Sequence, residues 1–121
     1  MLIVPSSAKV FLCSSPIDMR QSFDGLCGRV ESHFGQNPLC GNFFVFFSKR
    51  QDRMKILFWQ ADGFALFYKR LERGTFSWVP EAMRAQGSEI SPEEFALLLS
   101  GVNPLPAKNN RVTSTGALCQ Y

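Results

Sequence analysis

The sequence predicts a single α+β domain: an antiparallel β-meander of about five strands, with one main helix packed on a face and a C-terminal helix alongside. Three observations predict this fold. Between residues 43 and 78, runs of aromatic and branched residues alternate with polar breaks, a pattern typical of strands joined by hairpins. Residues 23–34 repeat apolar side chains at helical spacing, and residues 91–100 open with a helix-start signal.

The first half of the chain contains one short strand and the main helix. The apolar run Lys9–Cys13 predicts the first strand. Across Phe23–Phe34 the apolar residues recur at steps of three and four, which places them on one helical face. Gly35 is a natural end for this helix. A loop containing Pro38 and Gly41 then leads into the sheet.

Four apolar runs form the centre of the predicted sheet. They are Phe43–Phe47, Met54–Trp59, Phe64–Leu71 and Phe76–Trp78. Asp62-Gly63 predicts a tight hairpin between the second and third runs. Most of the aromatic residues lie in these runs, so we expect the core to form on this sheet.

The last third of the chain is predicted to be less regular. Glu81–Gln86 weakly favours a short helical turn. Ser91 followed by Pro92 and two glutamates is typical of a capped helix, which we expect to end at Gly101. We therefore predict one domain over residues 1–102 and a flexible, polar and proline-containing tail over residues 103–121.

Alternation along the hairpin sorts its side chains onto two faces. One face holds Met54, Ile56, Phe58, Ala65, Phe67 and Lys69, and we expect this face to pack on the core. The other face holds Lys55, Leu57, Trp59, Leu66, Tyr68 and Arg70. Cations interleaved with aromatic rings suit nucleic acid, because cations neutralise phosphates and rings stack on bases. A β-bulge would exchange the two faces, and the same cations also suit plain solvated strand ends.

Composition narrows the class of protein. The chain is 45% hydrophobic and 19% charged, which suits a folded domain, and its formal charge of +3 is compatible with a polyanionic partner. The four cysteines form no Cys-x-x-Cys pair, so the sequence predicts free thiols and no zinc site. With no leader and no apolar run long enough for a membrane span, we expect a cytoplasmic protein.

The sequence offers little for catalysis. His33, the only histidine, lies near the end of the predicted helix, where a cation complements the helix dipole. Asp18, Asp24, Asp52 and Asp62 each sit beside a turn, where aspartate is common for local reasons. We therefore predict no catalytic residues, no metal and no cofactor, and a metal-dependent nuclease is the least favoured reading.

Several motifs together resemble a known family. The first is Asp18-Met19-Arg20 followed by Phe23-Asp24-Gly25. The others are Phe44-Val45-Phe46, Lys49-Arg50, Asp52-Arg53, Lys55-Ile56-Leu57, Asp62-Gly63, Tyr68 to Gly74, and Phe76 to Pro80. In this order they resemble the small TnpB accessory protein of the insertion-sequence-66 family of bacterial transposable elements. That protein is distinct from the RNA-guided nuclease of the same name.

The resemblance implies a protein encoded beside a transposase that assists movement of the element. It provides no catalytic residues. We expect a non-enzymatic factor that binds DNA of the element ends, or the transposase–DNA complex. The candidate nucleic-acid contacts are Lys49, Arg50, Arg53, Lys55, Trp59, Tyr68, Lys69, Arg70 and Arg73. The alternative is a protein–protein adaptor that docks the transposase without contacting DNA.

The first family motif has a structural interpretation as well. Its residues are Asp18, Met19, Arg20, Phe23, Asp24 and Gly25. Arg20 and Asp24 lie four residues apart, so they are expected to pair on one helical face and brace the turn before the helix. In the alternative, Arg20 joins the basic surface.

Overall fold

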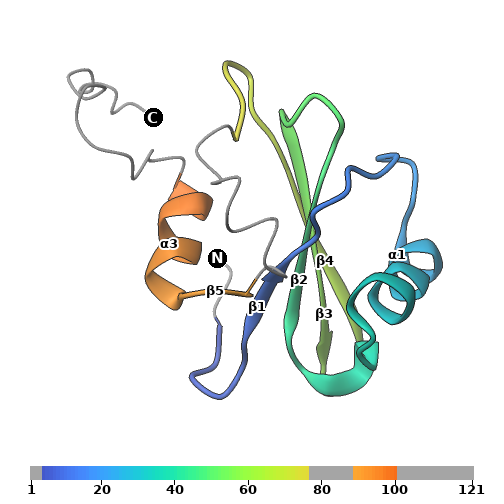
Figure 1. The fold of residues 1–121 in the computed structure, drawn as a ribbon. Coiled ribbons are helices and arrows are strands. Elements are labelled where there is room, and N and C mark those ends of the chain that lie inside the picture. Colours follow the sequence, from blue (N-terminus) through green and yellow to red (C-terminus); the bar gives the residue numbers. More distant parts are fainter. Residues whose placement is uncertain (1–3, 77–88, 101–121) are drawn as a thin grey trace.

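The computed structural model describes residues 4–76 and 89–100. Five strands form one sheet with the order β4-β3-β2-β1-β5, and a helix lies on each side of it (Figure 1). The strands are β1 (Val10–Leu12), β2 (Phe43–Phe47), β3 (Arg53–Gln60), β4 (Gly63–Arg70) and β5 (Glu89–Ile90). The helices are α1 (Phe23–Arg29), its π-helical extension η1 (Val30–Phe34), the short 3-10 helix η2 (Pro38–Cys40), and α3 (Pro92–Ser100). This architecture confirms the predicted α+β fold class.

The sheet is antiparallel except at one pair. β2, β3 and β4 form the expected meander, whereas β1 pairs with β2 in parallel and with β5 in antiparallel fashion. The physical reason is the connection between β1 and β2. It contains α1 and η1, which cross one face of the sheet and return the chain to the end where β1 began.

The fifth strand of the sheet is not the one predicted from the sequence. The fifth strand is Glu89–Ile90, whereas Phe76 of the expected last run lies in irregular chain. Ser77 and Trp78, the predicted turn at Glu81–Gln86 and the predicted tail from residue 103 lie outside the described residues.

The hairpin between β3 and β4 turns one residue earlier than the predicted Asp62-Gly63 turn. Gln60 pairs with Gly63, so only Ala61 and Asp62 form the loop, and Ala61 takes a positive φ of 40°. Ile56 lies opposite Phe67. This pairing confirms the sorting of side chains onto two faces, because no bulge interrupts the ladder.

Two cores lie on opposite faces of the sheet. Under α3, the predicted core residues Met54, Ile56 and Phe58 pack with Phe95 and Leu98. The other face is also a core over much of its area, because α1 and η1 cover it with Leu26 and Val30. β2 is buried at all five positions as a result. The face expected to be an open binding surface is therefore open only where α1 does not reach.

Local sequence signals explain how both helices begin and end. α1 and η1 together cover the predicted Phe23–Phe34, and Gly35 follows with a positive φ of 64°. At α3, Ser91 and Glu94 form a capping box. The Ser91 N–H donates to Glu94 Oε1 at 2.9 Å, and the Glu94 N–H donates to Ser91 Oγ at 3.0 Å.

Candidate nucleic-acid interface

The β2–β3 loop and the segment after β4 lie side by side at one end of the sheet. The Leu71 N–H donates to the Asp52 carbonyl at 2.8 Å, and the Phe76 N–H donates to the Gln51 carbonyl at 2.7 Å. Phe76 is buried and packs on Phe47, with ring centroids 5.6 Å apart. These contacts gather a set of cations that we call the basic end: Lys49, Arg50, Arg53, Arg70 and Arg73.

Most of the basic end is open to solvent. Lys49, Arg50, Arg70 and Arg73 are exposed, and Arg53 is partly buried. Two acids, Asp52 and Glu72, lie in the same segments. Glu72 accepts hydrogen bonds from Arg70 at 3.1 and 3.2 Å. Both side chains of that ion pair are more than half exposed, so it contributes little stability and leaves Arg70 free to exchange partners.

Arg53 and Arg70 are direct cross-strand neighbours. Like charges placed directly opposite each other destabilise a sheet. The Nε of Arg53 is also buried, and it has no hydrogen-bond partner among the residues that the structure describes. Arg53 thus lies beside a like charge, and Arg70 is paired with Glu72.

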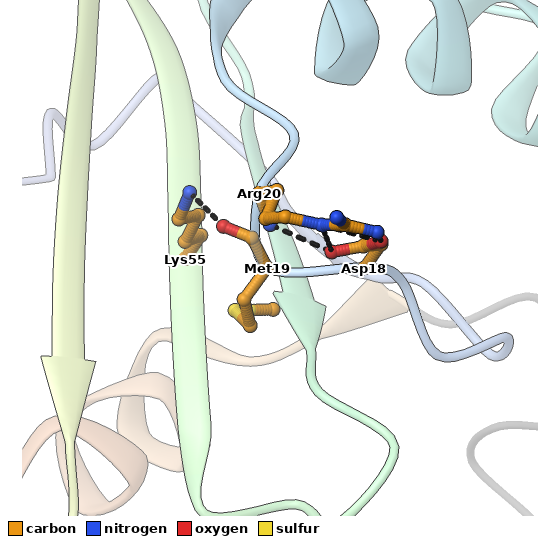
Figure 2. Close-up of polar contacts among 4 residues, drawn as sticks. All are labelled: Asp18, Met19, Arg20 and Lys55. Carbon is orange, nitrogen blue, oxygen red and sulfur yellow. Dashed lines mark hydrogen bonds and ion pairs between the residues drawn. The ribbon is translucent and has the colours of Figure 1, made fainter.

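Lys55 is buried in the fold and does not belong to the basic end. It is only 6% exposed, and its ammonium donates to the carbonyls of Met19 and Gln21, each at 2.7 Å; Figure 2 shows the bond to Met19. The ammonium also lies 4.8 Å from the ring centre of Tyr68. Burial lowers the pKa of Lys55 below its ordinary value of 10.5, and Asp18 opposes that shift. Lys55 thus fixes the 18–21 loop to β3.

The same loop contains an exposed ion pair. Arg20 donates from Nη2 to Asp18 Oδ2 at 2.7 Å, and its main-chain N–H donates to Asp18 Oδ1 at 2.9 Å (Figure 2). These bonds, the side-chain ones first, lower the pKa of Asp18 from 3.8 to about 2. The expected pairing of Arg20 with Asp24 is therefore wrong. Arg20 lies before the helix, which begins at Phe23, so the four-residue helical spacing does not apply to it.

Three further candidate contacts lie in different places. Lys69 points toward the other face and donates to the Leu99 carbonyl at 2.7 Å, which ties β4 to the end of α3. Trp59 packs on Phe64 near the hairpin loop, six residues from Arg53 and so about 20 Å from the basic end. Tyr68 is 50% exposed and shares a face with Arg70, its neighbour two positions along β4. The structure therefore brings Tyr68 to the basic end and does not bring Trp59.

Other reactive groups are dispersed. Within residues 4–76 and 89–100, no group of three His, Cys, Asp or Glu side chains could hold a metal ion. His33 Nε2 lies 3.2 Å from Ser14 Oγ, next to the end of η1. Cys13, Cys27 and Cys40 are free thiols, and burial raises the pKa of the first two. No helix in the described part of the chain is long and apolar enough to cross a membrane.

The Lys55 contacts are the feature that sequence reasoning missed. The alternation placed Lys55 on the correct face, but its partners are carbonyl groups more than 30 residues earlier in the chain. One signal was present: Asp18-Met19-Arg20 is a compact polar motif in a region without a predicted strand or helix. Such a motif indicates a loop that is held in place by contacts with the rest of the fold.

The fold and the site define a small α+β domain with a cationic end. Comparison with known protein families agrees with that description and identifies the family. Residues 8–109 match the model of the IS66 Orf2-like proteins. The chain belongs to this family, whose members are accessory proteins of insertion sequences with no known catalytic activity. The match confirms the resemblance seen in the motifs, which run from Asp18 to Pro80.

Two relatives come from Sinorhizobium fredii (strain NBRC 101917 / NGR234). The uncharacterized protein y4jC is 36% identical over 103 residues, which cover 84% of this chain and 86% of the relative. The uncharacterized protein y4hO is 37% identical over 103 residues, which cover 85% of this chain and 88% of the relative. No solved structure matches the chain.

Proposed function

We propose that the protein is a non-enzymatic accessory factor in transposition that binds DNA of the element ends, or the transposase–DNA complex, through its basic end. One observation carries this proposal: the main-chain hydrogen bonds Leu71–Asp52 and Phe76–Gln51 bring the β2–β3 loop and the segment after β4 together. The basic end formed there has five cations, against the two carboxylates of Asp52 and Glu72 in the same segments. Such an imbalance attracts a polyanion.

The residues have different roles in this proposal. Lys49, Arg50 and Arg73 contact phosphates, because their charges are exposed. Tyr68 offers an aromatic face beside them for a base or a sugar. Lys55 and Lys69 support the site from within, because they fix the 18–21 loop and α3.

Salt dependence tests the proposal. Each phosphate contact on B-DNA adds about 0.9 to the slope of log K against log salt concentration. We expect the full-length protein to bind duplex DNA of the element ends at low salt. The variant Lys49→Ala/Arg50→Ala/Arg73→Ala should then bind more weakly, with a slope reduced by up to about 2.7. Within residues 4–76 and 89–100 these three side chains make no hydrogen bond or ion pair, so the variant should keep its stability.

A matched control comes from the opposite end of the sheet. Lys9 is exposed and precedes β1, where its main-chain N–H donates to Asn42 just before β2 begins. Lys9→Ala removes the same charge as Lys49→Ala. If both changes weaken DNA binding equally, the attraction is a property of net charge, and the basic end is not the site.

The second candidate is a protein–protein adaptor that docks the transposase. It is favoured by exposed apolar side chains on the α1 side of the molecule, where Phe23 is 41% and Leu39 50% exposed. Absence of DNA binding at low salt, with transposase binding lost on Phe23→Ser, would support the adaptor over the DNA-binding factor.

A further inference from the structure

β4 forms one edge of the sheet. Among the residues that the structure describes, no strand pairs with its outer side. The opposite edge, β5, has two residues, whereas β4 has eight. A long edge strand presents a row of unpaired main-chain N–H and C=O groups, which are ready to pair with another chain.

The register shows which residues present those groups. Gln60 and Gly63 flank a two-residue loop and form a hydrogen-bonded pair. Bonded and non-bonded pairs then alternate, so Arg53 and Arg70 are a non-bonded pair. One contact confirms this alternation: the Ser48 N–H donates to the Arg53 carbonyl at 3.0 Å, on the β2 side of β3. The outward groups of β4 therefore belong to Phe64, Leu66, Tyr68 and Arg70.

β4 lacks the usual protection of an edge strand. Proteins guard such edges with proline, bulges, or charges in the middle of the strand. Residues 64–68 contain no proline and no charge, and the pairing with β3 is continuous from Gly63 to Arg70. Charges occur only at the two ends of the strand, as Asp62 in the hairpin loop and as Lys69 and Arg70.

We propose that the outer edge of β4 pairs in antiparallel fashion with the same edge of a second copy of this chain, about a two-fold axis at Leu66. The sequence is self-complementary in this register. Arg70 of one copy faces Asp62 of the other, and Phe64 faces Tyr68. On the α3 side, Phe67 faces the small Ala65. Every contact occurs twice, as a two-fold axis requires.

Two alternative registers place like charges opposite each other. An axis at Phe67 would place Asp62 of one copy against Glu72 of the other, and an axis at Lys69 would place two lysines against each other. Like charges directly opposite each other destabilise a strand pair, whereas opposite charges and aromatic pairs stabilise it. The axis at Leu66 also pairs every residue of β4 and leaves room beside Gly63 for the long side chain of Lys69.

Sedimentation of the full-length protein over a range of concentrations tests this proposal. We expect a dimer. Asp62→Arg alone and Arg70→Asp alone each replace two attractive pairs by two repulsive pairs, so each should raise the dimer dissociation constant about tenfold or more. The double variant Asp62→Arg/Arg70→Asp restores opposite charges and should recover most of the affinity. Arg73→Asp, which changes the charge equally but lies beyond β4, should have little effect.

Hydrogen exchange gives a second measurement that does not depend on variants. In the dimer, the amides of Phe64, Leu66 and Tyr68 should be protected only at concentrations where dimers form, whereas Ala65 and Phe67, which bond to β3, should be protected at all concentrations. A chain that stays monomeric at about 100 µM overturns the proposal. So does a dimer that both single variants leave intact, since its interface must then lie elsewhere.

Discussion

The two hydrogen bonds that Lys55 donates lead to a quantitative prediction about the free energy of unfolding. In Lys55→Met the aliphatic part of the side chain is kept, but the donor to the Met19 and Gln21 carbonyls is lost. A hydrogen bond with a charged partner contributes about 1.5–3 kcal/mol. Relief of the buried charge and access of water to the two carbonyls offset part of the loss. We therefore expect the free energy of unfolding to fall by about 2–4 kcal/mol.

Urea denaturation measures this change, and Lys69→Met is the matched control. Among the described residues, Lys69 donates one such bond, to Leu99 at the end of α3, so its replacement should cost about half as much. Limited trypsin digestion gives a local readout. Arg20 is exposed in the loop that Lys55 holds, so cleavage after Arg20 should become faster in Lys55→Met. Unchanged stability, within about 0.5 kcal/mol, together with unchanged cleavage would refute the role assigned to Lys55.

Two further predictions concern local contacts. Because the folded pKa of Asp18 is depressed to about 2, the Asp18–Arg20 pair stabilises the fold above the unfolded pKa near 4 and loses this effect as the pH falls toward 2. The stability difference between wild type and Asp18→Asn should therefore shrink over that interval; a difference that stays constant down to pH 2 would contradict the assignment. At α3, Ser91→Ala removes the oxygen that accepts from the Glu94 N–H and should cost about 1 kcal/mol in thermal or urea unfolding, whereas Ser100→Ala, at the other end of the helix, serves as a comparison and should cost less.

Sequence reasoning worked where the signal is local. The alternation of residues 54–69 predicted the two faces of the hairpin, although its loop is Ala61-Asp62 and not Asp62-Gly63. Ser91 with Glu94 marked the start of α3. The parallel pairing of β1 with β2 was missed, because nothing within Val10–Leu12 records the direction of its neighbour. The five consecutive apolar residues of β2 were a usable sign of a strand covered on both faces.

The candidate site was only partly predictable for a similar reason. Lys49 and Arg50 lie in the β2–β3 loop, Arg53 follows as the first residue of β3, and the hairpin register adds Arg70. Lys55 differs from them only in what covers it. Its burial depends on the 18–21 loop, whose path over the sheet is set by tertiary packing and cannot be obtained from periodicity.

The division of the interior into two cores has a consequence for how the molecule can change. Along β2, Phe44 packs under α1 while the next residue, Val45, packs under α3. Adjacent side chains thus serve separate compartments, and the sheet backbone forms the wall between them. A substitution in one compartment can be accommodated there by repacking its own helix. Each face is accordingly free to diverge among relatives while the other keeps its shape.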